Sequence, residues 1–578
     1  MEFSSAFKSS QHSIPSPNGA FIATLVPPRL FLRSTSSLEP IRIINVNPDF
    51  ASRVSFIRWS PRIATESTST CSSVSPLASR SGYFEGAATT KRRSGIDKTE
   101  EEGGSSMRIL LADEDTVRVW DVSDAKWTAA VQGVGGGLGK IANVEFGRNA
   151  DEVLVFSEFG VKLTLWSLVS GRSVEIRDPK FTSKGYGYRP CTSHFALLTR
   201  PAAHDVITIH AHTTYRLVNS FSVPTTDAQG LRWSPCGRWI AVWDSASSGY
   251  KVLVYTADGH LYRTYAAGQD GKVDGLGVKS LEWSPQGDYL AVGGHDKRIT
   301  LLSNFTFSPV VFLDHTSTIK LPRVPVWQEQ VSASGQRSYI TAAQPMCPPT
   351  VSSLPTDANP RVGISTIAFN NPDGTLIATR NDSMPTTVWI WSLKLLSPFA
   401  VIVQHSPVRS ISWHPTVPNL LMIQCNNDQG VVYLWSSTWE RPRIVTTPLD
   451  RLLGKHDAKW IRPETPRFEV SSPYPGMEDA RARQENRPMM MSGDFGSYFI
   501  GYVEEEGSES RQPPQKSPYA VTGKEPADYF TKMPLNPRNA SNLDGTPSSS
   551  GSSSRSPGVA TEEVDDTFQY RGRIFVQS

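Results

Sequence analysis

The chain has 578 residues, of which 38% are apolar and 10% aromatic, and its formal net charge is +3 at pH 7. This near-neutral balance excludes a protein held to nucleic acid or acidic lipid by overall charge, although it leaves local patches open. The first residues lack an apolar segment of signal-peptide length, and no apolar run reaches the roughly 18 residues of a membrane span. We therefore expect a soluble intracellular protein.

Two segments, LRWSPCGRWIAVWD from Leu231 and LEWSPQGDYLAVGGHD from Leu281, share seven of their first twelve residues. Repeats with periods of about 20 to 50 residues indicate solenoids or propellers. In WSPxG, Ser can cap a β-turn, Pro presets φ at the second position and Gly suits the fourth. An apolar run follows the turn, so each copy predicts a strand, a tight turn and a buried strand.

The same template recurs along the whole chain with falling fidelity. We identify nine units, which begin at Pro15, Val54 (interrupted and resumed at Met107), Val144, His194, Leu231, Leu281, Ile367, Ile411 and Met489. Four third strands end in VRVWD, LTLWS, VWIWS and VYLWS, a pattern typical of WD-repeat propellers, in which each blade is a four-stranded antiparallel sheet. A β-sandwich with many hairpins is the alternative, but it offers no reason for recurrence at this period.

The sequence thus predicts an all-β fold, a WD-repeat β-propeller over residues 1–505. Nine units are too few for two seven-bladed rings, so we expect one ring with degenerate or accessory units; a large single ring is the other arrangement. The N-terminal MEFSSAFKSS is expected to complete the last blade. At the end of a third strand, only Trp120–Asp121 keeps the full Trp-Asp dipeptide, and the Gly-His pair that opens regular blades is essentially missing. We therefore expect the buried His, Asp and Ser network of regular blades to be absent and aromatic packing to stabilise the blades.

Segments rich in Ser, Thr, Pro or mixed charge interrupt this pattern. We expect disordered insertions at about 63–106, 321–358 and 441–488, because such composition cannot bury a core. Residues 506–578 include GTPSSSGSSSRSPG and are expected to form a disordered low-complexity tail. Alternation in TFQYRGRIFVQS predicts a short edge strand at its end.

The sequence contains no recognisable catalytic, cofactor or metal site. The glycine-rich loop of residues 132–140 lacks the Walker A spacing, because Val134 and Ile141 occupy positions that need Gly and Ser or Thr. His210 and His212 share one face of a strand, but no third ligand lies at a clear spacing, and no CxxC pair suggests zinc. We expect a protein that is not an enzyme.

Without a chemical site, we expect the protein to act by binding partners through its surface loops. In a propeller, the loops after second strands should lie on the rim. Two such loops carry the candidate partner-binding residues, which are Trp243, Asp244, Arg380, Asn381 and Asp382. Exposed Trp and Arg dominate binding hot spots. The alternative is that Trp243 packs between blades and Arg380 pairs with Asp382.

LIATRNDSMPTTVWIW, together with LRWSPCGRWIAVWD, GVKSLEWSPQGDYLAVGGHDKRITLLSN and SPVRSISWHP, resembles the family of the WD-repeat-containing protein WRAP73 (WD-repeat protein eight). The resemblance covers roughly residues 1–62, 107–320 and 359–437 and, less closely, 489–505, whereas the insertions and tail fall outside it. It implies a non-enzymatic scaffold of the cytoplasm and cytoskeleton, at centrosomes or spindle pole bodies, that anchors microtubule minus ends for spindle assembly. The implied partners are a coiled-coil microtubule-anchoring protein of the SSX-interacting type and, in fungal members, a minus-end-directed kinesin.

Two other functions stay open at the level of sequence. A propeller of this kind can serve as a generic adaptor for a ubiquitin ligase or another multiprotein complex. An enzyme built on a propeller would need convergent carboxylates or histidines at the centre of the ring.

Overall fold

A computed structural model gives the arrangement of the strands within Met1–Glu506. It describes residues 1–10, 13–62, 107–131, 140–181, 183–266, 277–351, 362–426, 430–449, 452–462 and 487–504. The predicted insertion at 63–106 and the predicted tail with its edge strand lie outside these residues, as does most of the glycine-rich loop. None of the described helices is long and apolar enough to cross a membrane.

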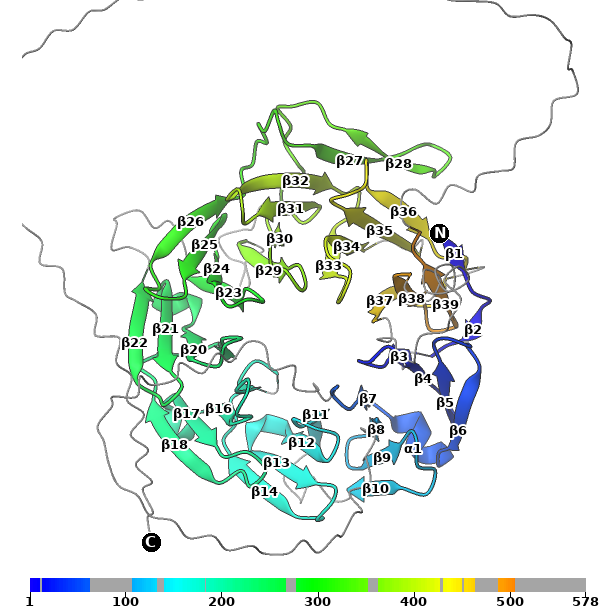
Figure 1. Cartoon of the computed structure of the whole chain (residues 1–578), viewed down its shortest axis with the longest axis vertical. Helices are drawn as coiled ribbons and strands as arrows, with labels where there is room; N and C mark the ends of the chain where they lie inside the picture. Colours follow the sequence, from blue (N-terminus) through cyan, green and yellow to red (C-terminus); the bar gives the residue numbers. More distant parts are fainter. Residues whose placement is uncertain are drawn as a thin grey trace, which may run out of the picture. The chain divides into compact units, whose positions relative to one another are not determined.

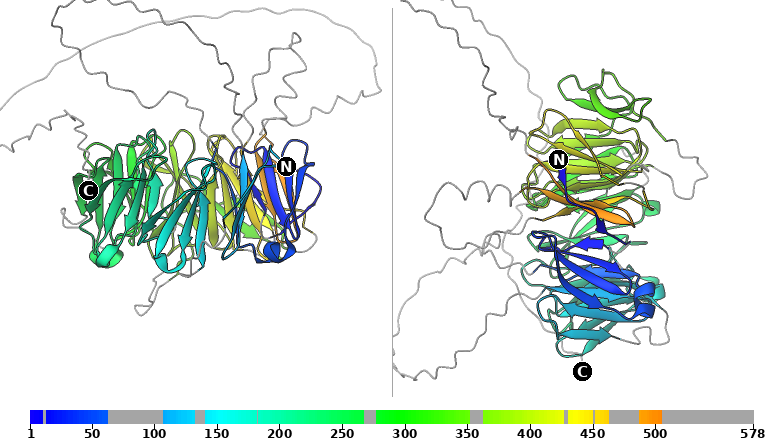
Figure 2. Two further views of the ribbon diagram at one scale, coloured as in Figure 1. Left: turned by 90° about the horizontal axis from the view of Figure 1, so that it is seen from below. Right: turned by 90° about the vertical axis from the view of Figure 1, so that its right-hand side faces the viewer.

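The described strands form nine sheets, antiparallel apart from one parallel pair in blade 7, that follow one another around a single ring (Figure 1). We number these sheets as blades 1 to 9 in chain order; first strands lie nearest the ring axis and fourth strands at the circumference. Figure 2 shows the ring edge-on, with the sheets side by side. All nine predicted units are therefore blades of one large ring, and none is an accessory unit.

The first four blades contain sixteen strands in chain order: β3 (Ser13–Pro15), β4 (Phe21–Val26), β5 (Arg29–Ser34), β6 (Pro40–Asn45); β7 (Phe56–Trp59), β8 (Arg108–Ala112), β9 (Val117–Asp121), β10 (Thr128–Val131); β11 (Ile141–Phe146), β12 (Glu152–Ser157), β13 (Lys162–Ser167), β14 (Ser173–Arg177); β15 (Tyr186–Tyr188), β16 (Phe195–Thr199), β17 (Val206–His210), β18 (Leu217–Ser222).

Blades 5 to 8 follow the same order: β19 (Gly230–Trp233), β20 (Trp239–Trp243), β21 (Lys251–Thr256), β22 (Leu261–Ala266); β23 (Val278–Trp283), β24 (Tyr289–Gly294), β25 (Arg298–Ser303), β26 (Pro309–Asp314); β29 (Ile364–Phe369), β30 (Leu376–Asn381), β31 (Thr387–Ser392), β32 (Ser397–Val403); β33 (Val408–Trp413), β34 (Leu420–Cys425), β35 (Val431–Ser436), β36 (Arg443–Thr446).

Short helical segments occupy a few connections: α1 (Pro48–Arg53), η1 (Glu158–Gly160), η2 (Pro201–Ala203) and η3 (Ala246–Ser248). The helix α1 begins because the Asn47 side chain accepts hydrogen bonds from the backbone N–H groups of Asp49 and Phe50. Its Phe50 packs in the apolar cluster that joins blades 1 and 2.

The repeated turn has the geometry that its residues predict. In blade 5 the Gly237 N–H donates to the Ser234 carbonyl at 2.9 Å, with Gly237 at φ +68°, a conformation that favours glycine. The Ser234 hydroxyl accepts the Trp239 N–H at 3.0 Å, which ties the turn to the start of β20. Ser284 and Gly287 make the same contacts in blade 6. Each copy of the motif therefore specifies one hairpin locally.

The ring closes through the N-terminal segment, as predicted. Blade 9 consists of β37 (Asp457–Ile461), β38 (Met489–Gly493) and β39 (Ser497–Tyr502), and its outer edge pairs with β1 (Glu2–Phe3) and β2 (Phe7–Lys8). The two ends of the propeller sequence thus share one sheet, so that closing the ring requires the pairing of residues far apart in the chain.

The predicted insertions at 321–358 and 441–488 need correction. Residues 326–341 form a hairpin, β27 (Val326–Val331) and β28 (Arg337–Thr341), whose first strand runs parallel to β32 outside blade 7 (Figure 1). Its Glu329 is buried and accepts hydrogen bonds from Arg337 and the Tyr433 hydroxyl. The second segment, 441–488, contains β36 and β37, and its residues 450–451 and 463–486 lie outside the described part.

The expected absence of a buried histidine network is wrong for two blades. In blade 7, His315 Nε2 and the Trp391 indole both lie 2.8 Å from the Thr379 hydroxyl. In blade 9, His456 Nε2 lies 3.0 Å from the hydroxyls of both Thr447 and Ser492. Here the histidines follow Asp314 and Lys455 in place of glycine, so the missing Gly-His pair did not indicate a missing network.

Candidate functional site on the connector face

The order of the strands gives the ring two different faces. In every blade the turn between the second and third strands lies on the same face as the connection to the next blade. We call this the connector face, and we call the face with the WSPxG-type turns the turn face. All five candidate partner-binding residues belong to second strands or to the turns that follow them, and so lie on the connector face.

Trp243 does not present its ring to solvent. It is 5% exposed at the end of β20 and packs in the apolar cluster between blades 5 and 6. Glycine at position 230 leaves room for it, because a Cβ there would lie 2.5 Å from the indole. The alternative interpretation, that Trp243 packs between blades, describes the structure, and the expectation of an exposed Trp is wrong.

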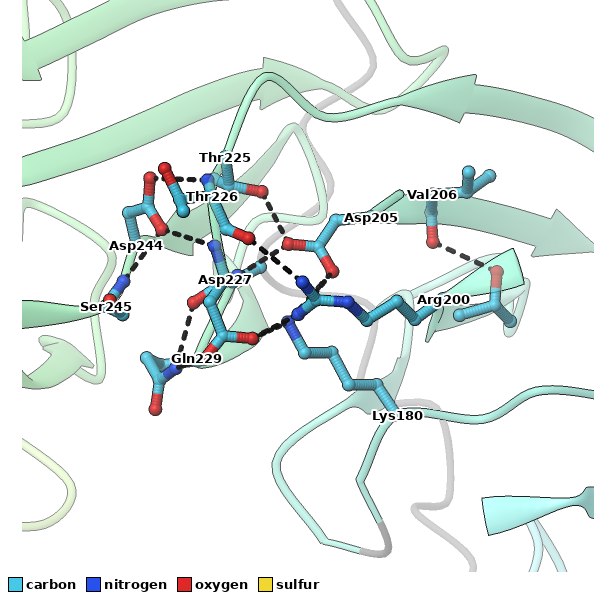
Figure 3. Close-up of polar contacts among 12 residues, drawn as sticks. Lys180, Arg200, Asp205, Val206, Thr225, Thr226, Asp227, Gln229, Asp244 and Ser245 are labelled. Atoms are coloured by element: carbon cyan, nitrogen blue, oxygen red, sulfur yellow. Dashed lines mark hydrogen bonds and ion pairs between the residues drawn. The ribbon is translucent and has the colours of Figure 1, made fainter. Parts of the chain in front are cut away.

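Asp244 is also buried, and it fixes the connection that precedes β19. Its carboxylate accepts the N–H groups of Thr226, Asp227 and Ser245 at 2.8–3.0 Å (Figure 3). A carboxylate that accepts several backbone N–H groups satisfies donors that a loop would otherwise leave unpaired. Asp244 is therefore a structural clamp on the connector.

A second clamp holds the same connector from the blade 4 side. Asp205, completely buried, accepts the Thr225 hydroxyl at 2.8 Å and the Ala228 N–H at 2.6 Å. Lys180 Nζ lies 2.8 Å from Asp205 and 2.9 Å from Asp227 (Figure 3). The buried carboxylate is thus compensated by a cation from the preceding connector.

Arg200 completes this cluster near the surface by pairing with Asp227. Burial tends to raise the pKa of Asp227, but hydrogen bonds and charge from Lys180 and Arg200 outweigh it and lower the pKa. Asp227 is consequently ionised at neutral pH. Four charged side chains from two connectors and one turn here form a single ionic network: Lys180, Arg200, Asp205 and Asp227.

Arg380 and Asp382 lie in a comparable network between blades 6 and 7. Their side chains pair at 2.9 Å, as the alternative interpretation predicted, and Lys279 Nζ lies 2.7 Å from the other Asp382 oxygen. The Ser365 hydroxyl donates to Asp382 at 2.6 Å. These contacts outweigh the effect of burial and lower the pKa of Asp382. Both side chains remain partly exposed.

Asn381 lies between these two residues but is fully buried. Its carbonyl oxygen accepts the N–H and the hydroxyl of Ser383 at 2.9 and 2.8 Å. Of the five predicted residues, therefore, only Arg380 and Asp382 can contact a partner directly. Whether a partner binds at this loop stays a prediction.

Exposed apolar side chains occur on both faces of the ring. On the connector face, Leu453 and Phe495 are 52% and 49% exposed, and the Phe495 N–H donates to the Leu453 carbonyl, which holds the two residues side by side. On the turn face, Phe305 and Leu395 are 72% and 70% exposed. These two pairs give matched probes of which face binds a partner.

His210, one of the two histidines considered as metal ligands, is engaged in other contacts. His210 Nδ1 lies 3.0 Å from the Tyr215 carbonyl and Nε2 lies 3.0 Å from the Thr208 hydroxyl. Burial lowers the pKa of His210, which keeps the imidazole neutral. Within the described ranges, no group of three His, Cys, Asp or Glu side chains could hold a metal ion.

Lys180, Arg200, Asp205 and Lys279 were not predicted as members of a site. Each is a single charged residue at the end of a strand or in a connector, a position that usually indicates a solvated surface. The only signal was the reappearance of charge just after apolar runs, as in ALLTR and IATRND. Their convergence depends on the placement of neighbouring blades, which one chain segment does not reveal.

Comparisons of the sequence with known proteins agree with a WD-repeat fold. The WD40 family, described as "WD domain, G-beta repeat", matches residues 263–301. The chain is 30% identical over 341 residues to the mouse WD repeat-containing protein WRAP73, covering 55% of this chain and 71% of that protein. It is 25% identical over 531 residues to the uncharacterized WD repeat-containing protein C32H8.09 of Schizosaccharomyces pombe, covering 88% and 94% of the two chains. Among solved structures, the C-terminal WD40 domain of Sif2 aligns with a TM-score of 0.41 at 10% identity, covering 77% of this chain and 98% of that domain.

Proposed function

From the premise that the chain belongs to the WD-repeat family of WRAP73, we propose that it is a non-enzymatic scaffold at the centrosome or spindle pole body. The observation that carries the proposal is the identity with the mouse protein, which spans 71% of that relative. A WD-repeat propeller of this family supports a role in protein–protein interaction. The proposal also includes localisation to the pole, anchoring of microtubules and the identity of the individual partners.

In this function the propeller binds a coiled-coil microtubule-anchoring protein of the SSX-interacting type, and the assembly anchors microtubule minus ends during spindle assembly. A minus-end-directed kinesin is the second proposed partner. What supports a binding role is that ionic clamps between blades fix the connectors. A surface that is already ordered loses little conformational entropy when a partner binds.

We further propose that the partner contacts the connector face, around Arg380, Asp382 and the exposed pair Leu453 and Phe495. The two charged residues offer a donor and an acceptor beside each other. The apolar pair supplies the buried contact that such interfaces need at their centre.

The first test images a fluorescently tagged copy through one cell cycle. Focused signal at the spindle poles is the expected result, and purification of the tagged protein should recover the coiled-coil partner. Diffuse signal together with recovered ligase subunits would overturn the proposal in favour of a generic ubiquitin-ligase adaptor.

The second test compares the two faces with matched variants. Leu453→Ser with Phe495→Ser should lose the partner and the pole signal, whereas Phe305→Ser with Leu395→Ser should keep both. Equal thermal midpoints for the two double variants would show that folding is unaffected. Loss of the partner only in the turn-face variant would place the binding surface on the opposite face.

A further inference from the structure

A basic hollow lies where blade 1 meets the N-terminal strand that closes the ring. Its volume is about 280 Å³, and its lining contains three cationic side chains and no carboxylate: Lys8, Thr24, Val26, Pro27, Pro28, Arg29, Phe31 and Arg33. Lys8 comes from β2, which pairs with blade 9, and the other residues come from β4, β5 and the turn between them. The hollow therefore exists only when the ring is closed.

The register of β4 and β5 explains why these side chains share one face. Thr24 lies opposite Phe31 and Val26 lies opposite Arg29, and residues opposite each other in an antiparallel pair point to the same side. Arg29, Phe31 and Arg33 alternate along β5 with Leu30 and Leu32, which are buried against blade 2. One face of β5 is thus apolar core and the other is cationic.

The three cations are not neutralised by neighbours. Among the described residues, Lys8, Arg29 and Arg33 form no ion pair with a carboxylate. The Arg33 guanidinium is held by the Phe7 and Phe31 rings, at 5.0 and 5.8 Å from their centroids, and by hydrogen bonds with the Leu38 carbonyl at 3.3 Å and with Tyr498. Aromatic rings orient a guanidinium while leaving its other N–H donors available.

A buried hydroxyl at the hollow adds an independent observation. Thr24 is 2% exposed and lines the hollow. The Tyr498 hydroxyl lies beside it, and hydrogen bonds with Thr24 and Arg33 oppose the raising of the Tyr498 pKa by burial. Cations without carboxylate partners next to these two hydroxyls suit an anion with several acceptor oxygens.

We propose that this hollow binds the phosphate of a phosphorylated serine or threonine in a partner protein. A phosphate monoester carries about −1.5 to −2 charges at pH 7 and three strong acceptor oxygens, which match cations and a hydroxyl. Val26, Pro27, Pro28 and Phe31 form the apolar part of the lining, suited to the side chain beside the phosphorylated residue. An inositol polyphosphate headgroup fits this hollow less well, because it would place several phosphates against a lining that is half apolar.

The inference deepens the proposed scaffold function by making partner binding depend on phosphorylation. The test uses the purified full chain and an oriented peptide library with one fixed phosphoserine or phosphothreonine, beside the same library without phosphate. Anisotropy with the enriched sequence then gives the dissociation constant. Because this assay uses no cells, its result is independent of whether the protein localises to spindle poles.

The expected result is enrichment of the phosphorylated library only. Lys8→Glu with Arg29→Glu should weaken binding by at least about tenfold, since a hydrogen bond to a charged group contributes about 1.5–3 kcal/mol. Both side chains are exposed, so the variant should fold. The matched control is Arg216→Glu with Lys394→Glu, two exposed cations elsewhere on the ring, which should bind like the wild type.

Thr24→Val is the finer variant, because it removes the hydroxyl and keeps the shape; it should weaken binding several-fold. Equal capture of the two libraries would overturn the proposal, and so would equal loss in the control variant. Binding to vesicles that contain phosphatidylinositol bisphosphate, lost in Lys8→Glu with Arg29→Glu but without any phosphopeptide binding, would assign the hollow to lipid instead.

Discussion

Closure of the ring by residues 1–10 makes the N-terminal aromatic residues unusually important for stability. Phe3 lies edge-on to Phe499 at 6.3 Å between ring centroids, and Phe7 stacks on Tyr498 at 5.4 Å. Both phenylalanines are half-buried against blade 9. Replacing both with Ser removes these contacts but keeps the chain length and the charge.

The expected cost follows from area and ring pairing. Half-burial of a Phe contributes about 1–1.5 kcal/mol, and an aromatic pair adds about 0.5–1.5 kcal/mol. The two sites together give about 4 kcal/mol. Because the unfolding entropy is about 2 cal/mol/K per residue, a ring of this size should lose about 4–5 °C in its thermal midpoint.

Tryptophan fluorescence during heating measures the midpoint, and hydrogen exchange locates the effect. Exchange should accelerate in β39, which loses its outer partner, before it does so in blades 4 and 5. The control replaces Phe159 and Phe305, which are 86% and 72% exposed, with Ser and should shift the midpoint by less than about 1 °C. Equal shifts in the two double variants would refute the idea that the N-terminal strand locks the ring.

Three further outcomes follow from the buried charges. Burial lowers the pKa of His315, His414 and His456 from the ordinary 6.5 to about 4. Below pH 6.5 these histidines therefore stay neutral in the folded protein, whereas in the unfolded chain they bind protons. Stability should therefore fall as pH drops from 6.5 towards 4, by about 1 kcal/mol per histidine at pH 5.5; an equal midpoint at pH 7.5 and 5.5 would contradict this. Glu329→Gln should weaken the charged contact with Arg337, cost about 2–3 kcal/mol and raise hydrogen exchange in residues 326–341 alone. Lys180→Met leaves Asp205 buried without its nearest cation and should cost about 3 kcal/mol by urea unfolding, whereas exposed Lys394→Met should cost almost nothing.

The blades could be predicted from sequence because each carries its own local instructions. Ser234 and Gly237 close their hairpin with hydrogen bonds that depend on four consecutive residues. Even a weak unit, such as Phe195–His210, keeps two apolar strands with a turn between them. The N-terminal strand could be predicted for a different reason, because a closed ring needs a partner for its last edge.

The hairpin at 326–341 is a case in which amino-acid composition alone gave the wrong prediction. Its Pro, Ser and Gln content indicated disorder, yet VWQEQV alternates as a strand does. Its stability comes from parallel pairing with β32, some seventy residues later, and from the buried Glu329. Similarly, position in a loop after a second strand predicted an exposed Trp243, but the room beside Gly230 allows burial. Non-local contacts decided both cases.

The polar contacts between blades differ from one junction to the next, so the connectors distinguish the positions around the ring more than the blades do. The blades repeat one turn chemistry, whereas three of the junctions are fixed by different groups: Asp205 and Asp244 at Asp227 and Ala228, Thr379 beside His315, and Ser492 beside His456. A repeated fold binds a specific partner only if its repeats differ where they face outward. Junctions with distinct charges supply that difference without altering the apolar packing between sheets. Specificity can therefore change at one junction while the ring stays closed, and partner binding should respond to single-junction variants on the connector face more than to changes in any WSPxG turn.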